Sequence, residues 1–529
     1  MSTVDESSAL REWEAVLGSA HLVVDSDKLA VLNTATFPTR AKALASLRPA
    51  NCREVQECVR IAAHQRIPIY PISTGRNWGY GSAVPVRDSV LLDLSRMNRI
   101  VDYDEELAFV TVEPGVTQGQ LYRFLAERGS RLWMDATGAG PDCSIVGNTL
   151  ERGFGHTPLG EHCGNVCGFE VVLPTGDCIE TGTLRFPGSK TGQVSRWGVG
   201  PSLDGLFAQS NLGIVTRMSV WLMPKPECFR AFFFQYESLG EVVEALRPLR
   251  LNGTLRSVVH IANDYKVLNG IRQYPWEMAE TTPLGREAMA TVRRRLGIGN
   301  WSGSGGMYGT RMQVREAQAL LRRALPRADR FFWLDDKRMD WIGRAEGLLK
   351  QFGGKALAQK LELIRPVYGL LKGIPTDAPL RSAYWRKKVR IPPDMHPDRD
   401  GCGLLWCSPL VPSRGSDAEI AVGRATEAIL KSGFEPLISV SMVTERSLAC
   451  IIAISYDRNV LGEDERAWHC YASLSHELTE AGYPPYRLNV RSMDLATTSA
   501  EYSNLLKAIK QAVDPCGILA PGRYEPAVR

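Results

Sequence analysis

The spacing of apolar and polar positions in the first 226 residues predicts a mixture of helices and strands. Residues 54–66 repeat their apolar side chains at helical spacing, whereas other short apolar runs, bounded by turn-forming residues, are typical of strands. Thr117 is expected to cap a further helix that ends at Gly129. The predicted strands are 67–72, 89–94, 107–113 and 212–223, with a hairpin over 169–182.

Beyond Pro224-Lys225-Pro226 the pattern changes, and strands alternate with longer helical segments. Residues 312–325 and 464–481 are examples of these segments, and residues 505–513 are again helical. A chain of 529 residues is long enough for two or more hydrophobic cores. We therefore expect an α+β protein with a domain boundary near residue 226.

Two glycine-rich stretches interrupt the first part of the chain. Residues 73–81 follow an apolar run and contain Gly75, Gly79 and Gly81, and no helical pattern comes after them. Glycines in such a loop allow positive φ and close backbone approach, so successive N–H groups can surround an anion. The loop lacks the GxGxxG spacing and the Gly-Lys-Ser/Thr ending of commoner phosphate loops. Alone it is more often a plain turn, but a second stretch, Gly138–Gly168, favours anion binding.

Composition indicates an ordinary globular protein and argues against two classes of partner. Hydrophobic residues make up 44% of the sequence and charged residues 23%, and a net charge of +5 is small for this length. No basic stripe suggests nucleic acid, and the run Arg386-Lys387-Lys388 is expected to be a solvated loop rather than a dock for an acidic partner. No run of about 20 apolar residues predicts a membrane span.

The remaining residue patterns favour a cytoplasmic protein without a metal site. The start, Met1–Glu6, is acidic and lacks the order of charges and apolar residues found in a signal peptide. The 12 cysteines lack zinc spacing, so reduced and mostly buried thiols are expected. His469 and His476 lie seven apart in a helical segment, but without further ligands a solvated helix face is favoured over a metal site.

A series of motifs, in order along nearly the whole chain, carries a resemblance to one family. The motifs are residues 73–81, 112–117, 146–153, 157–162, 204–216, 486–487 and 520–523. With them the chain resembles the vanillyl-alcohol oxidase and 4-cresol dehydrogenase family of flavoproteins. The resemblance implies a PCMH-type FAD-binding domain over residues 1–226, completed by the tail 490–529. It also implies an α+β cap domain, residues 227–489, that carries substrate contacts.

The resemblance implies FAD as cofactor, with its pyrophosphate held by backbone N–H groups of the two glycine-rich stretches. Asn148, Glu170 and Asn211 flank apolar strands, where they either hydrogen-bond the flavin or stabilise turns. The expected cofactor-binding residues are Ser73, Thr74, Gly75, Arg76, Asn77, Gly79, Pro114, Gly115, Gly147, Asn148, Thr149, Gly153, Gly155, Glu170, Gly213, Ile214, Val215 and Arg523.

In the family, two tyrosines and an arginine hold a para-substituted phenol as its phenolate, and the matching residues here are Tyr80, Tyr486 and Arg487. Two O–H donors and a permanent cation favour the charged form of the substrate. A para-phenolate pushes electron density toward its benzylic carbon, which eases departure of a hydride and leaves a quinone methide. The alternative is a core tyrosine and a surface Tyr-Arg pair without catalytic function.

The chain departs from the family at the positions that attach the flavin covalently. The family's histidine falls near Gly403 and its tyrosine near Asp377, and neither residue can form the bond. We therefore expect dissociable FAD, with Tyr384 the one neighbouring residue that leaves an attachment open.

Other departures lie closer to the substrate. His156 replaces a tyrosine and is expected either to activate the attacking water or to fill its space. The family's aspartate near the flavin falls opposite Asp142 or Ala139, and Asp142 is the candidate. Arg446 lies near the position of a His-His pair that borders the substrate in relatives, and a cation there would favour a substrate with a carboxylate or another electron-rich group.

These residues predict an FAD-dependent oxidoreductase that oxidises or hydroxylates the benzylic carbon of a para-substituted phenol. One alternative is a non-phenolic alcohol as substrate, and another is a flavin-binding subunit of low activity. The expected partners are a small aromatic substrate, O₂ or an electron-acceptor protein and, in a homodimer, a second copy of the chain.

Overall fold

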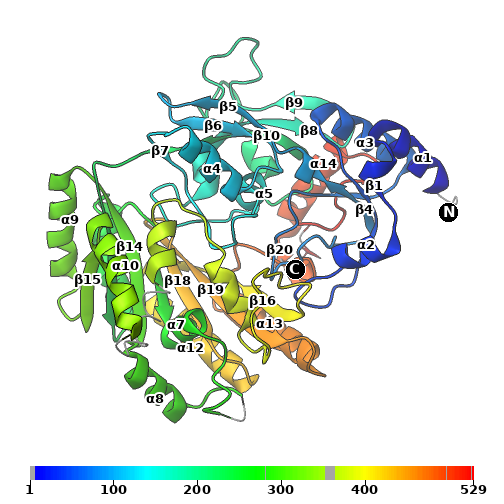
Figure 1. The fold of residues 1–529 in the computed structure, drawn as a ribbon. Coiled ribbons are helices and arrows are strands. Elements are labelled where there is room, and N and C mark those ends of the chain that lie inside the picture. Colours follow the sequence, from blue (N-terminus) through cyan, green and yellow to red (C-terminus); the bar gives the residue numbers. More distant parts are fainter. Residues whose placement is uncertain (1–5, 280–281, 352–363, 496, 526, 529) are drawn as a thin grey trace.

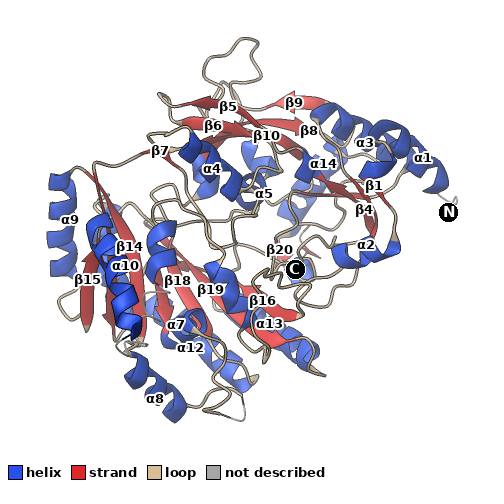
Figure 2. Cartoon of the chain, viewed as in Figure 1, coloured by secondary structure: helices blue, strands red, loops and turns tan. Residues whose placement is uncertain are grey.

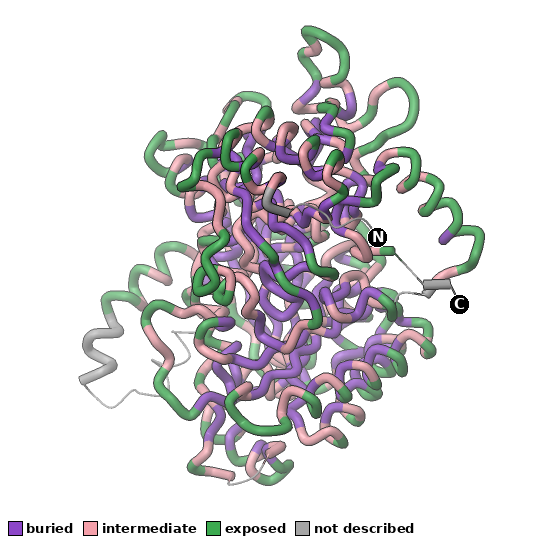
Figure 3. The backbone as a smooth tube through the Cα atoms, turned by 90° about the vertical axis from the view of Figure 1, so that its right-hand side faces the viewer, coloured by how far each residue is buried: buried purple, intermediate pink, exposed green. Residues whose placement is uncertain are grey.

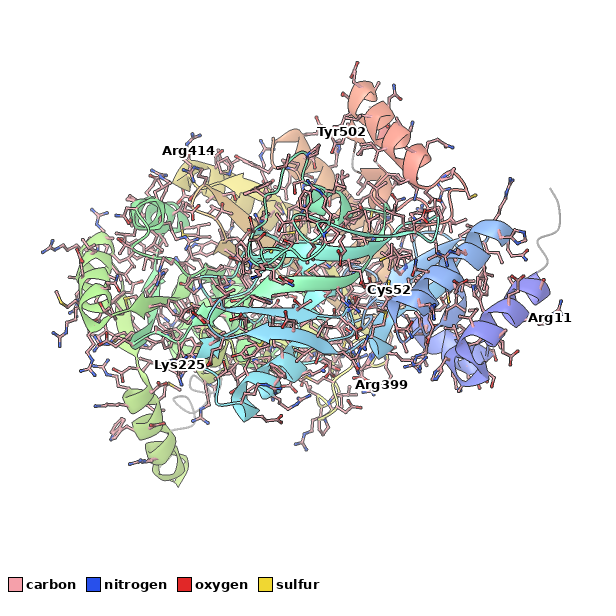
Figure 4. The ribbon with its side chains drawn as sticks, turned by 90° about the horizontal axis from the view of Figure 1, so that it is seen from above. Arg11, Cys52, Lys225, Arg399, Arg414 and Tyr502 are labelled. Carbon is pink, nitrogen blue, oxygen red and sulfur yellow. The ribbon has the colours of Figure 1, made fainter. Side chains whose placement is uncertain are left out.

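The structure, a computed structural model, describes residues 6–279, 282–351, 364–495, 497–525 and 527–528. The acidic start, residues 1–5, lies outside this range. Two groups of sheets lie side by side, one built from the first 226 residues and one from the green-to-orange segment that follows (Figure 1). Lys225, labelled in Figure 4, lies where the chain passes from one group to the other.

The N-terminal part contains two main sheets, as the apolar spacing predicts. A four-stranded sheet has the order β1-β2-β4-β3, with β1 antiparallel to β2 and the other pairs parallel. A five-stranded antiparallel sheet has the order β5-β6-β10-β8-β9, and β7 pairs with β11. The strands are β1 Leu22–Val23, β2 Ala43–Leu47, β3 Ile69–Ile72, β4 Ser89–Asp93, β5 Ile100–Asp104, β6 Phe109–Val112, β7 Leu132–Trp133, β8 Val166–Val172, β9 Cys178–Glu180, β10 Ile214–Trp221 and β11 Met223–Pro224.

Helices of this part bury apolar faces against the two sheets. The helices are α1 Glu6–Leu17, α2 Ser26–Leu32, α3 Cys52–Gln65, α4 Gln118–Glu127 and α5 Ile145–Leu150. Helix α3 matches the predicted helix over 54–66, and its buried stripe packs with α1 on the four-stranded sheet. Thr117 caps α4 by accepting a hydrogen bond from the Gln120 N–H, and Gly129 follows with φ +59°, both as predicted.

The second part is an antiparallel sheet with the order β15-β12-β14-β13-β18-β19-β16, and β17 also pairs with β19. Its strands are β12 Cys228–Tyr236, β13 Val259–Asn263, β14 Trp301–Gly309, β15 Arg330–Leu334, β16 Cys402–Cys407, β17 Leu410–Pro412, β18 Leu437–Met442 and β19 Ser447–Asp457. Its helices are α6 Leu239–Leu251, α7 Asp264–Ile271, α8 Arg286–Leu296, α9 Arg311–Ala324, α10 Asp336–Gln351, α12 Gly415–Lys431 and α13 Glu463–Glu480. Figure 2 shows this sheet in red, flanked by its helices.

The two faces of this sheet have different surroundings. Side chains at alternate positions, such as Val259 and Ile261 of β13 and Val440 of β18, join a core with α6, α9, α12 and α13. Because successive side chains on a strand point to opposite faces, His260 and Ser441 face the other way, toward the N-terminal part. The buried residues, purple in Figure 3, run through the middle of the molecule.

The C-terminal tail returns to the N-terminal part. Helix α14, Ala500–Val513, lies beside blue and cyan elements in Figure 1, and Leu519 bridges to Ile69 of β3. The short strands β20, Thr497–Thr498, and β21, Ala527–Val528, pair in parallel. The division into residues 1–226 with the tail and residues 227–489 stays a prediction about folding units.

The structure adds one helix that the sequence pattern did not indicate and shows one expectation to be wrong. The second glycine-rich stretch contains α5, a short helix that Ser144 caps by accepting a hydrogen bond from the Gly147 N–H at 2.9 Å. The basic run at 386–388 is not a solvated loop, because Arg386 and Lys387 are buried. Arg386 pairs with Glu435 at 3.0 Å, and Lys387 pairs with Asp457 at 2.7 Å. The sequence pattern could not indicate these distant acidic partners.

Candidate active site

A cavity of about 430 Å³ lies between the two parts of the molecule. Its walls come from the loop 72–80, helix α5 and the start of β10 on one side, and from strands β13, β16, β18 and β19 on the other. Tyr486 and Arg487, near the end of residues 227–489, and Arg523 of the tail also line it. Segments from the whole length of the chain therefore meet at one site.

One end of the cavity presents backbone N–H groups without partners. The N–H groups of residues 74–77 donate no hydrogen bond to another described residue, although the loop lines the cavity. Gly75 has φ +67°, a conformation that glycine adopts without strain. Gly147 brings α5 against this loop, because a Cβ there would lie 3.0 Å from Ser73 Oγ. Backbone N–H groups are strong donors that require an acceptor, so this end of the cavity fits an anion such as a phosphate.

Charged side chains add to the positive character of the cavity. Among the described residues that line it, the arginines and lysine are Arg76, Lys266, Arg487 and Arg523, and the one carboxylate is that of Glu151. Arg523 pairs with Glu151 and donates to the Tyr70 hydroxyl. Burial works against the charge of Glu151, but Arg523 and Arg487 lower the pKa of its carboxyl below the usual value. The loop and Arg523 fit the pyrophosphate of FAD.

The expected cofactor-binding residues fall into two groups. Those that line the cavity are Ser73, Thr74, Gly75, Arg76, Asn77, Gly147, Asn148, Gly153, Gly213, Ile214, Val215 and Arg523. Those that do not line it are Gly79, Pro114, Gly115, Thr149, Gly155 and Glu170.

Most of the second group supports the cavity wall from behind. A Cβ on Gly79 would lie 2.1 Å from Trp406 Cδ1, and one on Gly155 would lie 1.5 Å from Asp135 Oδ2. The carbonyl oxygen of Pro114 accepts from Ser144 Oγ at 2.6 Å. Glu170 lies elsewhere, where it accepts a hydrogen bond from Thr216 and pairs with Arg217 on β10.

Tyr80, Tyr486 and Arg487 line the same end of the cavity. The Arg487 guanidinium lies 4.0 Å from the centre of the Tyr80 ring, and its Nη2 donates to Asn77 Oδ1 at 2.6 Å. The Tyr80 hydroxyl lies 2.9 Å from Ser408 Oγ and also hydrogen-bonds the Tyr486 hydroxyl. The backbone holds this group together, because Tyr486 N–H donates to the Ser408 carbonyl at 3.0 Å.

Burial sets the protonation of this group. It raises the pKa of both tyrosine hydroxyls, although Arg487 opposes the shift, so both remain O–H donors near neutral pH. Burial alone would lower the pKa of Arg487, but Glu151 and Tyr80 raise it above the usual value. Two donors and a fixed cation therefore converge on a point where a phenolate oxygen would be stabilised.

Two neutral histidines also line the cavity. The His156 and His260 ring centres lie 4.3 Å apart. Because carbonyl oxygens only accept, His156 Nδ1–H donates to Ala136 O and His260 Nε2–H donates to Gly155 O. Burial lowers the pKa of both rings. His260 uses its other nitrogen with Ser441, whereas His156 Nε2 makes no hydrogen bond to a described residue and can accept a proton.

The buried aspartate of this region is Asp135, not Asp142. Asp142 is exposed and does not line the cavity, whereas Ala139 does. Asp135 accepts from the backbone N–H groups of His156 at 3.1 Å and Thr157 at 2.6 Å, and pairs with His162 at 2.6 Å. Burial would raise its pKa, but His162 lowers it below the usual value. Asp135 therefore stays ionised and positions the backbone of His156.

Lys266 was not foreseen as a site residue. It lies in the first turn of α7 and reaches the cavity, with Nζ 5.5 Å from the Trp406 ring centre and 3.2 Å from Asn269 Oδ1. Burial lowers the pKa of its ammonium group from 10.5 to about 8. Arg446, which was expected to supply a cation here, is instead exposed beside Glu445 and does not line the cavity.

An alternating pattern was the missed signal. In Ile438-Ser439-Val440-Ser441-Met442, apolar residues at every second position join the core, while Ser439 and Ser441 line the cavity. His260 stands between Val259 and Ile261 in the same way. Period-two alternation predicts a strand with one face in the core. It could therefore have placed His260, Ser439 and Ser441 on the other face of the sheet.

Of the positions tied to covalent flavin attachment, Tyr384 is engaged elsewhere and Gly403 has no side chain. The Tyr384 hydroxyl donates to Asp400 Oδ2 at 2.5 Å, and Tyr384 does not line the cavity. A Cβ on Gly403 would lie 2.4 Å from the Tyr456 ring. Dissociable FAD stays a prediction.

Outside the cavity, Cys52, Glu170 and Cys178 are the one described group with the spacing of metal ligands, and Figure 4 labels Cys52. The Sγ atoms of Cys52 and Cys178 lie 3.6 Å apart. None of the helices in the described part of the chain has both the length and the apolar character that a bilayer crossing requires.

Comparison with known proteins adds the family context. Residues 43–182 match the family of FAD binding domains. The chain is 42% identical to the 1'-carboxy-chondrochloren decarboxylase of Chondromyces crocatus, over 99% of this chain and 98% of that protein. It is 34% identical to the 4-cresol dehydrogenase [hydroxylating] flavoprotein subunit of Pseudomonas putida, over 98% and 95% of the two chains. The solved structure of p-cresol methylhydroxylase with substrate bound superposes with a TM-score of 0.88, at 33% identity over 98% and 96% of the chains.

Proposed function

The chain belongs to the vanillyl-alcohol oxidase and 4-cresol dehydrogenase family of FAD-dependent oxidoreductases, and we propose that it takes a hydride from the benzylic carbon of a para-substituted phenol. The observation that carries this proposal is the convergence of Tyr80, Tyr486 and Arg487 in one buried cavity that also contains the glycine-rich phosphate cradle. These residue types at one point suit a phenolate better than a neutral alcohol.

The protein's part in the reaction follows from this geometry. Tyr80 and Tyr486 donate hydrogen bonds to the phenolate oxygen, and Arg487 compensates its charge. The ionised oxygen then releases electron density through the ring to the benzylic carbon. Bound FAD supplies the acceptor for the hydride. The loop 73–77 and Arg523 hold the phosphates of the cofactor. Loss of the hydride leaves the substrate as a quinone methide.

Water attack is one fate of the quinone methide, and it gives a benzylic alcohol. His156 can take the proton of the attacking water, because Nδ1–H is fixed on Ala136 and Nε2 is free to accept. Asp135 holds the backbone of His156 in place. We assign His156 this role as general base.

Decarboxylation is a second fate, and the relative of 42% identity, which is named a decarboxylase, favours it. It requires a carboxylate on the carbon next to the benzylic carbon. The electrons of the broken C–C bond form the alkene, CO₂ leaves and the phenolate is restored. No oxygen atom enters the product.

The partners follow from the same proposal. The enzyme takes a small aromatic substrate, and O₂ or an acceptor protein would take up the electrons after each turnover. The relative named as a flavoprotein subunit favours the acceptor protein. Oxidation of a non-phenolic alcohol is the alternative activity, and a homodimer is the assembly we propose.

The test is the visible spectrum of the holoenzyme, mixed without oxygen with 4-ethylphenol and with its O-methyl ether. We expect the yellow band to bleach with the phenol and to persist with the ether, because the ether cannot become a phenolate. Bleaching with both compounds would instead establish a non-phenolic mechanism. No bleaching with either would overturn the proposal.

Acid precipitation of the holoenzyme tests whether FAD dissociates. We expect the flavin to stay in the supernatant, since the Tyr384 hydroxyl is engaged by Asp400 and neither Gly403 nor Asp377 can form a bond to it. A yellow precipitate that keeps its colour after washing would contradict non-covalent binding.

A further inference from the structure

Lys266 occupies a position that ordinarily disfavours a cation. It is the third residue of α7, after the N-cap Asn263, and its largely buried side chain lines the cavity. The N-terminus of a helix carries partial positive charge and favours anions. Burial of an unpaired ammonium group costs free energy as well. Both effects oppose a lysine here unless an anion binds beside it.

The surrounding elements supply no such anion. Helix α7 packs against β13, β14, β18 and residues 378–384, and none of these four segments contains aspartate or glutamate. The acidic residue of α7 itself, Asp264, lies 3.6 Å from the Arg293 Nε. His260 of β13 faces the cavity as a neutral ring. Among the described residues, the hydrogen-bond partner of Lys266 Nζ is the side-chain amide of Asn269.

The cavity wall connects Lys266 to the phenol-binding residues. The Trp406 ring lies under the Lys266 ammonium group, and Trp406 Nε1 donates to the Trp78 carbonyl at 3.1 Å. The same ring packs on Gly79, the residue before Tyr80. Lys266 and Gly79, the residue before Tyr80, therefore lie against the same tryptophan, along which a substrate side chain can extend.

We propose that Lys266 binds a carboxylate on the side chain of the phenolic substrate. This inference rests on the proposed function and narrows its substrate class to 4-hydroxyphenyl compounds whose para substituent ends in a carboxylate. The phenolate oxygen lies at Tyr80, Tyr486 and Arg487, and the carboxylate lies at Lys266. The ion pair recognises the substrate; whether water attack or loss of CO₂ follows depends on which carbon carries the carboxylate.

The test measures binding without turnover, by titration calorimetry on the holoenzyme. The ligands are 4-hydroxyphenoxyacetate and its neutral counterpart 4-ethoxyphenol, both with oxygen in place of the benzylic carbon, so neither can lose a hydride. We expect Lys266→Met to weaken binding of the acid by about 100-fold, because a desolvated charge pair is lost. Binding of the neutral ligand should weaken by less than about threefold. Lys266→Arg keeps the charge, so its affinity for the acid is expected to lie within about tenfold of the wild-type affinity.

Lys388→Met is the matched control, since Lys388 also lies over a tryptophan, Trp276, but is exposed. Lys388→Met is expected to leave the binding of both ligands unchanged. Equal weakening of both ligands by Lys266→Met, or release of FAD, would overturn the proposal by giving Lys266 a structural or cofactor role. Unchanged binding of the acid would overturn it as well. Failure of wild type to bind either ligand would instead overturn the phenol site itself.

Discussion

Two buried cations in the same cavity have opposite surroundings. Arg487 lies 3.4 Å from Glu151, donates to Asn77 and stacks on Tyr80, and these partners raise its pKa against the effect of burial. Lys266 has an amide and a tryptophan ring for neighbours, and burial lowers its pKa to about 8. One charge is fixed by the protein, and the other depends on what binds.

The difference indicates what each end of the cavity is built to do. A guanidinium that the protein already compensates is preorganised, so it stabilises developing charge without reorganising. Keeping an uncompensated ammonium group charged costs free energy until an anionic ligand neutralises it, so this group discriminates between ligands. We therefore expect Arg487 to govern catalysis on every phenol and Lys266 to govern the choice among phenols.

The largest expected effect comes from removing the compensated cation, Arg487. Arg487→Leu should lower kcat/KM for 4-ethylphenol on the order of 10³-fold, because the phenolate loses its buried cation. The loss should be similar for phenols with and without a carboxylate. Steady-state kinetics of the purified holoenzyme, with FAD content matched by absorbance, measures the effect.

Arg446→Leu is the control for that substitution, since its side chain is 80% exposed. It should leave kcat/KM unchanged for both kinds of phenol. An Arg487→Leu enzyme within tenfold of wild type would show that the cation does not stabilise the phenolate.

His156 offers a third environment, a buried base without charge. His156→Phe should slow formation of the benzylic alcohol about 100-fold, because the attacking water loses its proton acceptor. The rate of cofactor bleaching in a single turnover should change much less. Product analysis after rapid quenching separates the two steps, with the exposed His476 replaced by phenylalanine as control.

Equal losses in bleaching and alcohol formation would contradict a role as base. That result would favour the alternative in which His156 only fills the space of a tyrosine.

A smaller expected effect is the pH dependence of carboxylate binding at Lys266. The carboxylate ligand should bind wild type with constant affinity up to about pH 8 and then weaken by up to about tenfold per pH unit, since Lys266 loses its proton there. Expressing its Kd as a ratio to that of 4-ethoxyphenol removes the titration of the phenol itself. Lys266→Arg should flatten the ratio, and a wild-type ratio that is constant from pH 6.5 to 9.5 would contradict the assignment.

The comparison also separates what the sequence could and could not predict. The glycine loop and the capped helix after Thr117 follow from local patterns, and the grouping of Tyr80, Tyr486 and Arg487 follows from the resemblance to the family. Lys266 follows from neither, because a lysine in a helical segment is ordinarily a solvated residue. Only the packing of α7 against strands without acidic residues makes it an unpaired cation.

The reverse error occurred at Arg386 and Lys387, where a basic run predicted a solvated loop. Their partners, Glu435 and Asp457, lie 49 and 70 residues away along the chain. Asp142 failed similarly, because a loop's sequence does not determine which of its carboxylates turns inward. Side-chain burial at long range is the information that a single sequence lacks.

The smallest effect concerns stability and has the opposite sign from the effects on function. The pKa of Lys266 falls from 10.5 to about 8 in the folded protein, so the unfolded chain binds more protons between these values and stability rises with pH in that window. Below pH 8 the full penalty applies, and Lys266→Met should stabilise the ligand-free holoenzyme at pH 7 by on the order of 1–3 kcal/mol. Scanning calorimetry at one scan rate should show a Tm higher by about 1–4 °C, and a gain less than about half as large at pH 9.5. A lower Tm for Lys266→Met at pH 7 would mean that the protein itself satisfies the ammonium group, and the contrast with Arg487 would then disappear.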